Sequence, residues 1–261
     1  MKFEIGCLGS GSKGNSVFIK NGKTCLICDQ GLSVREFVKR AKGEGLEKAS
    51  AIIITHEHYD HIRGVEGLAL TYNLPIFVHE RALKAYLEKV EEGRRLKIRT
   101  FSDMSFELCD LEITPFRIPH DTSYPVGFSV SNGKEKVSVA TDLGRVTDGI
   151  YSNLKGSDAV IIESNHDIEL LKNGKYPETL KKRILSDIGH LSNGDGTSCA
   201  ARLIKDGTKG IIFAHLSEEN NTKMHVQSAA EMAFSEHGIK SGDATVIIAG
   251  QKESCRLWRE Q

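Results

Sequence analysis

Residues 56–61, His-Glu-His-Tyr-Asp-His, combine three imidazoles with the carboxylate of Asp60. Imidazole nitrogens and carboxylate oxygens are both common metal ligands in proteins. His56 and His58 lie two positions apart in a segment that reads as extended, so both can point to one side, and Asp60 and His61 follow where a helix begins. The spacing predicts a loop that binds two metal ions close together. A histidine-rich polar loop without a ligand is the weaker interpretation, because clustered unpaired histidines repel one another once protonated.

Five apolar runs that read as buried strands each end at an ionisable residue. The run at 51–54 leads to the hexapeptide, and the other four lead to His120, Asp142, Glu163 and His215. In layered α/β proteins, ligands bind beyond the carboxyl ends of the strands. We therefore expect these residues to form one site. The four histidines at 79, 166, 225 and 237 lack this setting as a set and are left out of it.

The elements that must position these residues alternate in a mixed α/β order. The patterns predict strands at 3–8, 16–20, 23–28, 50–55 and 76–78, and further strands between 97 and 140 with a hairpin turn at Gly133. They predict helices at 33–42, 61–72, 80–92, 179–188, 193–205 and 226–236, and from Asp158 onward the order strand, helix, strand, helix, strand. This order predicts a single α/β domain over residues 1–261, with two mixed sheets packed together and helices outside.

Composition sets limits on partners and location. Lysine plus arginine and aspartate plus glutamate are 35 each, so no global field attracts a polyanion and nucleic-acid binding would need a local patch. No apolar run approaches a membrane span, and the first residues do not read as a signal peptide. The six scattered cysteines predict reduced thiols and a cytoplasmic location. Cys25 and Cys28 form a C-x-x-C on a strand, where odd spacing sends their sulfurs to opposite faces, so we expect core residues.

These motifs resemble the metallo-β-lactamase superfamily over the whole chain. The resemblance implies a four-layer αββα sandwich with a dinuclear metal site between the sheets. It also implies a ligand set, with His56, His58 and His120 on one metal, Asp60, His61 and His215 on the other, and Asp142 bridging both. Asp29, at the end of an early strand, matches the family's first acidic motif and would orient ligands through hydrogen bonds.

Several subfamilies fit less well. Secreted β-lactamases need an export signal, which the first residues of this sequence do not resemble. Many of them also carry a cysteine where this chain has Asp142. The diiron flavoprotein branch has glutamate at the position of His58. The long inserted domain of the β-CASP nucleases has no room within residues 143–214.

The C-terminal third resembles the phosphodiesterase branches of the superfamily. Residues 189–193, Gly-His-Leu-Ser-Asn, and residues 213–217, Phe-Ala-His-Leu-Ser, carry that resemblance. It implies that His190 stabilises the scissile phosphate or protonates the leaving oxygen, with Glu163 as a weaker candidate. Asp60 would bind a metal and orient the nucleophile, a hydroxide activated by two metal ions. The mixed nitrogen and oxygen ligands suit zinc or manganese, with iron as a further option.

The opening loop, residues 9–16, narrows the resemblance. It contains a literal G-x-G-x-x-G, but a strand follows instead of a helix, so a dinucleotide site is excluded. Together with the other motifs it is similar to the YycJ (WalJ) group, which implies 5′-to-3′ DNA exonuclease activity. Lys13, Asn15 and Ser192 are candidate phosphate contacts, and N-capping of a helix is the other role of Ser192.

Two basic runs are candidate DNA contacts, although such runs are more often solvated faces. They are residues 181–183 and the set Arg94, Arg95, Lys97 and Arg99. Two alternatives to the exonuclease stay open. One is a hydrolase of a small, for example cyclic, phosphodiester or of another ester, and the other is a non-catalytic module that binds metal or nucleic acid.

Overall fold

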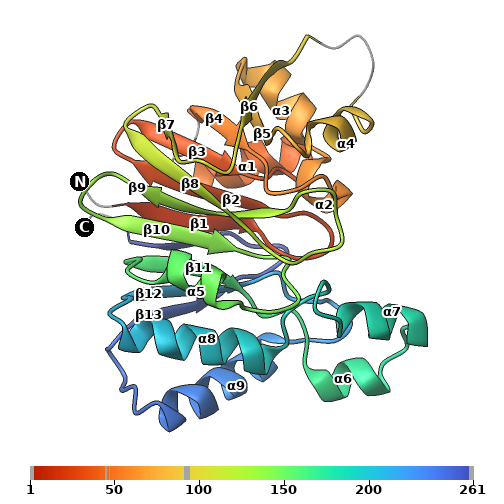
Figure 1. Ribbon diagram of the computed structural model, residues 1–261, viewed down its shortest axis with the longest axis vertical. Coiled ribbons are helices and arrows are strands. Elements are labelled where there is room, and N and C mark those ends of the chain that lie inside the picture. The colour runs from red at the N-terminus through yellow and green to blue at the C-terminus, as the bar shows by residue number, and fades with distance from the viewer. Residues whose placement is uncertain (1–2, 45, 47, 91–94, 259–261) are drawn as a thin grey trace.

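The computed structural model describes residues 3–44, 46, 48–90 and 95–258. They form two seven-stranded sheets (Figure 1). The first sheet contains, in spatial order, β14 (Cys255–Leu257), β1 (Glu4–Gly9), β2 (Ser16–Asn21), β3 (Thr24–Cys28), β4 (Ala51–Ile53), β5 (Pro75–His79) and β6 (Lys97–Phe101). The second contains β13 (Thr245–Ile248), β12 (Gly210–Ala214), β11 (Ala159–Glu163), β10 (Lys136–Ala140), β9 (Val126–Ser131), β8 (Leu111–Arg117) and β7 (Phe106–Leu108).

Each sheet is half antiparallel and half parallel. In the first sheet, β14 to β3 pair antiparallel and β3 to β6 pair parallel. In the second, β13 to β10 pair parallel and β10 to β7 antiparallel. Parallel strands end at the same edge of a sheet. The residues that follow β3, β4 and β5 therefore lie at one edge of the first sheet, and those that follow β10, β11 and β12 lie at one edge of the second.

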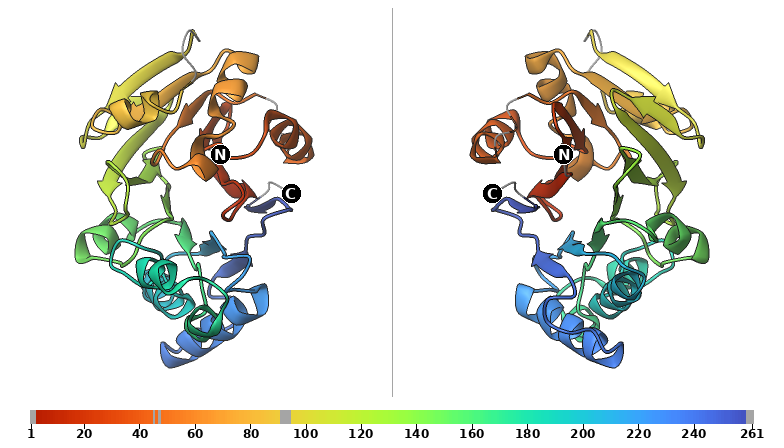
Figure 2. Two further views of the ribbon diagram at one scale, coloured as in Figure 1. Left: turned by 90° about the vertical axis from the view of Figure 1, so that its right-hand side faces the viewer. Right: turned by 90° about the vertical axis from the view of Figure 1, so that its left-hand side faces the viewer.

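Helices cover the outer faces of the two sheets (Figure 2). The helices beside the first sheet are α1 (Val34–Glu44), α3 (Val65–Tyr72) and α4 (Leu83–Leu87), and those beside the second are α5 (Asp148–Leu154), α8 (Asn193–Lys205) and α9 (Lys223–Glu236). Three short helices gather at the edge where the parallel strands end, on the right of Figure 1: α2 (Tyr59–Ile62), α6 (Ile168–Asn173) and α7 (Glu178–Ile184). The predicted arrangement of two mixed sheets between helices is confirmed.

Strand β11 shows how the sequence builds this sandwich. All of its residues are buried, and successive side chains point to opposite faces. Ile161 belongs to the apolar core between the two sheets, together with Phe18 and Phe128. Val160 and Ile162 belong to a second core, which packs the same sheet against its helices. A strand buried on both faces needs a continuous apolar run, which is what residues 159–162 provide.

Several predicted elements need correction. The helix expected over 61–72 is two helices, because the backbone N–H of Gly64 donates to the carbonyl oxygen of Gln30 at 2.8 Å and not to the preceding turn. An added Cβ on Gly64 would lie 1.9 Å from the carbonyl oxygen of Leu32, so only glycine fits at this break. The helix expected over 80–92 is limited to α4 in the described chain, and residues 91 and 92 lie outside it. The helix expected over 179–188 ends at Ile184, and helices α5 and α6 were not predicted.

Two smaller predictions are confirmed. Gly133 has φ 82° at the turn between β9 and β10. Cys25 and Cys28 are both buried in β3, and all six cysteines lie in the described chain as free thiols. Among the helices described, none is long and apolar enough to cross a membrane.

Candidate metal centre

Histidines and aspartates from both sheets converge at the edge where the parallel strands end. His56 follows β4, and His58 is the N-cap residue of α2, which carries Asp60 and His61. His120 follows β8, Asp142 follows β10 and His215 follows β12. Asp142 and His215 have φ angles of 60° and 57°, a left-handed conformation that is uncommon outside glycine and often marks functional sites.

The side-chain donor atoms of these residues fall into overlapping groups, each with its atoms within 4.8 Å of one another. His56, His58 and His120 form one group, and Asp60, His61 and His215 form another. Asp142 joins a third group with His56 and His61 and a fourth with Glu163, His190 and His215. Asp142 therefore lies between the two histidine groups. The structure brings together all seven residues that the sequence nominated as ligands.

Contacts at one ring nitrogen orient the imidazoles of this cluster. Nδ1 of His56 lies 2.9 Å from Oγ1 of Thr55, and Nδ1 of His120 lies 3.1 Å from the carbonyl oxygen of Gly189. These contacts occupy one ring nitrogen and turn Nε2 toward the centre of the cluster. Nε2 of His56, Nε2 of His215 and Oδ2 of Asp142 are buried and have no hydrogen-bond partner among the described residues. Buried polar atoms are rarely left unsatisfied, so a cluster of three fits a site for cations.

Asp29 lies behind His61. Its Oδ2 is 2.7 Å from Nδ1 of His61 and accepts a hydrogen bond from Oγ1 of Thr55 at 2.6 Å, while its Oδ1 accepts from the backbone N–H of Thr55 at 2.8 Å. Because Asp29 is buried and its φ is 61°, the turn after β3 places the carboxylate at this point. Asp29 thus orients His61 and touches Thr55, a contact that the sequence did not reveal.

Glu163 orients two imidazoles at once. Its Oε1 lies 2.8 Å from Nδ1 of His190 and 2.7 Å from Nδ1 of His215. Its Oε2 accepts hydrogen bonds from the backbone N–H groups of Leu143 and Leu191, both at 3.0 Å. Glu163 is fully buried, and with these four contacts both of its oxygens are occupied. This geometry suits a residue that positions the imidazoles of His190 and His215.

The opening loop contacts the cluster through Asn15. Its Nδ2 donates to Oδ2 of Asp60 at 3.1 Å and lies 3.0 Å from Nε2 of His61. Asn15 therefore supports the donor cluster directly, which the sequence did not suggest. Lys13 lies at the surface in an ion pair with Glu218 at 2.5 Å. Ser192 caps α8, accepting from the backbone N–H of Asp195 at 3.1 Å.

Burial and the surrounding charges give the cluster the charge states of ligands. Burial lowers the pKa of His56 well below its usual value, and burial together with the charge of His120 lowers the pKa of His58 to about 4. Burial alone would raise the pKa of Asp142, but the charges of His215 and His61 hold it well below its usual value. Two neutral imidazoles and an ionised carboxylate are the forms that bind cations.

The other two imidazoles behave differently. Burial alone would lower the pKa of His215, but Asp142, Asp60 and Glu163 raise it to about 10. Burial is likewise outweighed at His61, where the same kind of carboxylate neighbours, Asp142 first, raise the pKa well above its usual value. A metal ion must displace these protons, so binding would release them.

The remaining histidines lie outside the donor groups. Nε2 of His79 is 3.2 Å from Oδ1 of Asp103, and Nδ1 of His225 contacts Oγ1 of Thr222. His237 contacts the carbonyl oxygen of Ala233. His166 is buried and neither of its ring nitrogens has a hydrogen-bond partner among the described residues, but no donor group there includes it.

The basic runs lie apart from one another. Arg94 is outside the described residues, and Arg95, Lys97 and Arg99 are exposed on or just before the edge strand β6. In the second run, Lys181 is buried and Arg183 pairs with Asp121, next to His120.

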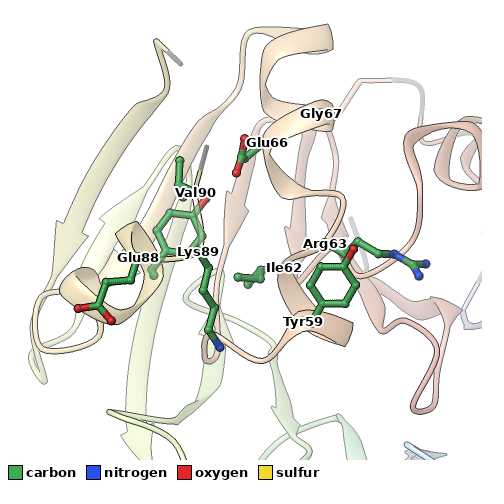
Figure 3. Close-up of a pocket in the computed structure, with 9 residues that line it drawn as sticks. Tyr59, Ile62, Arg63, Glu66, Gly67, Glu88, Lys89 and Val90 are labelled. Carbon is green, nitrogen blue, oxygen red and sulfur yellow. The ribbon is translucent and has the colours of Figure 1, made fainter. Parts of the chain in front are cut away.

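Two cavities flank α2. The first, of about 220 Å³, is lined by His58, Asp60, Asp142, His190 and His215 together with residues of other elements. The second, of about 490 Å³, is larger, but none of its lining residues in the described chain belongs to a donor group (Figure 3). Lys89 in its wall donates a hydrogen bond to the carbonyl oxygen of Glu57 at 2.7 Å and so supports the backbone of the histidine motif. Donor-group residues therefore line the smaller cavity and not the larger one.

Comparison with known proteins agrees with this geometry. Residues 24–215 match the family described as a beta-lactamase superfamily domain. The chain is 34% identical over 257 residues to exodeoxyribonuclease YycJ of Bacillus anthracis, with 95% of each chain covered. It is 35% identical over 254 residues to exodeoxyribonuclease WalJ of Streptococcus pneumoniae, with 91% of each covered. In structure it is similar to the metallo-beta-lactamase fold protein YhfI from Bacillus subtilis, with a TM-score of 0.71, 16% identity, and 98% and 99% of the two chains covered. The chain belongs to the metallo-β-lactamase superfamily and, within it, to the group of the YycJ and WalJ proteins.

Proposed function

We propose that this protein is a metal-dependent hydrolase that cleaves phosphodiester bonds of DNA as a 5′-to-3′ exonuclease. The observation that carries the proposal is the convergence of seven donor residues, of which His58, Asp60, Asp142 and His215 line one cavity together with His190. DNA as the substrate is supported by the names of the relatives that match nearly the whole chain. The direction of degradation rests on the resemblance of the opening loop to the YycJ group.

The donor residues suit two divalent cations. We assign His56, His58 and His120 to one ion, Asp60, His61 and His215 to the other, and Asp142 to both. Nitrogen and oxygen donors in this mixture suit zinc or manganese, with iron as a further option. The buried atoms without partners, such as Nε2 of His56 and Oδ2 of Asp142, support this assignment.

The residues around the cations would each take one task. Two divalent cations, when bound, supply positive charge and lower the pKa of water so that a nucleophile exists near neutral pH. Asp60, held by the amide of Asn15, would orient that nucleophile. His190 lines the cavity with Nδ1 on Glu163, so Nε2 is the atom that can donate a proton to the leaving oxygen or a hydrogen bond to the phosphate. Glu163 would position His190 without touching the substrate.

A hydrolase of small phosphodiesters is the second candidate. The cavity of about 220 Å³ has room for a small ester beside the donor residues. A non-catalytic metal or nucleic-acid module fits less well, because binding alone does not need His190 held on a buried carboxylate. The free cysteines support a cytoplasmic location as part of the same proposal.

The test uses Mn²⁺- or Zn²⁺-loaded protein and linear DNA labelled at either end. We expect stepwise release of nucleotides from the 5′ end, arrest by phosphorothioate linkages at the 5′ end and no arrest by the same linkages at the 3′ end. An Asp60→Ala/His61→Ala variant is the inactive control. Hydrolysis of bis(p-nitrophenyl) phosphate without degradation of DNA under either metal would refute the exonuclease and favour the small-ester hydrolase.

A further inference from the structure

The outer wall of the active-site cavity comes from α7 and the link before it, where the sequence offered residues 181–183 as a candidate DNA contact but did not nominate Tyr176. Tyr176, in the link between α6 and α7, lines the cavity together with Leu180, Arg183 and Ile184 of α7. The opposite side of the same cavity carries Asp60 and the other metal-site residues. In Figure 1, α6 and α7 project from the sheet edge beside α2.

The C-terminal end of α7 is attached to the chain next to the metal site. Nη2 of Arg183 donates to Oδ1 of Asp121 at 2.9 Å, and Asp121 directly follows His120 in the chain. Asp187 lies three residues after the end of α7, and an added Cβ on Gly144 would lie 2.2 Å from its backbone. The loop after α7 therefore packs directly on the chain that follows Asp142. The position of α7 is therefore coupled to the donor cluster.

A buried lysine also attaches α7 to the neighbouring helix α6. Lys181 is buried in α7, and its Nζ donates to the carbonyl oxygen of Lys172 at 2.7 Å and to Oε1 of Glu178 at 3.0 Å. This contact joins α7 to α6. Tyr176 lies in the short connection between the two braced helices and is half-buried. The two joined helices therefore fix the position of the link that carries Tyr176.

The wall and the floor of the cavity differ in chemistry. The floor carries imidazoles and carboxylates, whereas the wall carries the aromatic ring of Tyr176 and the apolar side chains of Leu180 and Ile184. Arg183 adds a guanidinium group, which has five N–H donors, and its contacts with Asp121 use Nε and Nη2. Nη1 can therefore donate to a second acceptor. A nucleotide offers matching groups, with a base for the wall and a phosphate for the floor.

Resting on the nuclease function proposed above, we propose that Tyr176 stacks on the base of the nucleotide at the scissile phosphate and that Arg183 contacts a phosphate of the same strand. A stacked base needs no particular sequence, because every base has a π-face. We place one nucleotide of a single strand at this cavity, with its base on the wall. Tyr176 and Arg183 are then the residues that distinguish a nucleic acid strand from a simple phosphate ester.

Tyr176 is tested with a pair of variants and a pair of substrates. Loss of one base stack costs a factor of roughly 5–100 in affinity. Tyr176→Ala should raise KM for a single strand by that factor, Tyr176→Phe should stay near wild type, and Tyr72→Ala, which removes an exposed tyrosine on α3, is the matched control. A strand with abasic residues at its two 5′-terminal positions should erase the difference between wild type and Tyr176→Ala.

The outcomes separate this inference from the function on which it rests. If wild type degrades DNA and Tyr176→Ala keeps its KM, the stacking role is wrong while the exonuclease stands. If wild type degrades no DNA, the exonuclease itself fails. Should Tyr176→Ala not fold, wild type alone decides, because it must bind the abasic strand more weakly than the normal strand by roughly the same factor of 5–100.

Arg183 is tested by the salt dependence of binding. Arg183→Gln should weaken binding of single-stranded DNA and reduce the slope of log K against log salt by roughly 0.7, the value for one phosphate contact. Asp121→Asn breaks the same ion pair but leaves the guanidinium, so it should keep the slope. Equal slopes for wild type and Arg183→Gln would mean that Arg183 only anchors α7.

Discussion

Replacing Asp29 by asparagine tests whether the contact between Asp29 and Nδ1 of His61 orients this imidazole. The carboxylate faces three donors: the backbone N–H and hydroxyl of Thr55, and Nδ1 of His61. Asparagine has nearly the same shape and tolerates the φ of 61°, but it offers one acceptor oxygen and an NH₂ group. If the oxygen stays on Thr55, the NH₂ group faces Nδ1 of His61 and favours the tautomer with its proton on Nε2. That nitrogen is the one directed at Asp60 and Asp142.

The magnitude follows from contacts of this kind. Removing a partner that orients a metal-binding histidine typically costs about 10–100-fold in metal affinity, or about 1.4–2.8 kcal/mol. Hydrogen bonds to a charged group contribute about 1.5–3 kcal/mol to stability, so Asp29→Asn should also lower the free energy of unfolding by an amount of that order. Because the exchange alters one imidazole, only the ion that uses His61 should be weakened.

The assay is a titration of metal-free protein with Zn²⁺ against a chromogenic chelator, followed by denaturant unfolding of the same samples. Asp110→Asn is a matched control, because Asp110 also accepts from a threonine hydroxyl, that of Thr24, but lies exposed at the surface. The control should bind two ions as wild type does. A folded Asp29→Asn variant with two unchanged affinities would refute the argument that Asp29 sets the tautomer of His61.

Three further predictions follow from the same geometry. Glu163→Gln should lower kcat and weaken the ion that uses His215, because its NH₂ group must face either the two imidazoles or the backbone N–H groups of Leu143 and Leu191; steady-state kinetics with metal titration checks this, and unchanged values in both would contradict it. Gly31→Ala should cost at least about 1–3 kcal/mol in denaturant unfolding, since its Cβ would lie 1.6 Å from the carbonyl oxygen of Asp60; a neutral effect would show that this loop is free to shift. Removal of metal by a chelator should lower the melting temperature by several degrees, because a ligand at about 100 times its Kd adds about 2.7 kcal/mol of stability, and calorimetry with metal added back should restore it.

The sequence alone was sufficient for the strands and for most of the donor residues. Apolar runs report which strands are buried, and the ionisable residue after each run marks a strand end, so His120, Asp142 and His215 could be identified without a structure. The C-x-x-C at 25 and 28 could be assigned to the core by its spacing on a strand. These features are local, because residue type and period decide them within a few positions.

Only the tertiary structure decided the contacts that support and cover the site. Asn15 meets Asp60 across 45 positions, and at the helix break the backbone N–H of Gly64 donates to the carbonyl oxygen of Gln30. Arg183 belongs to a basic run that the sequence offered as a DNA contact or a solvated face, and the local pattern did not nominate Tyr176. Both line the cavity because α7 and the link before it lie beside the donor cluster. Periodicity reports that a face is buried, but the partner on that face depends on which strands are neighbours and on the paths of the loops between them. For that physical reason the donor residues could be read from the chain, whereas the groups that orient them and the wall that faces them could not.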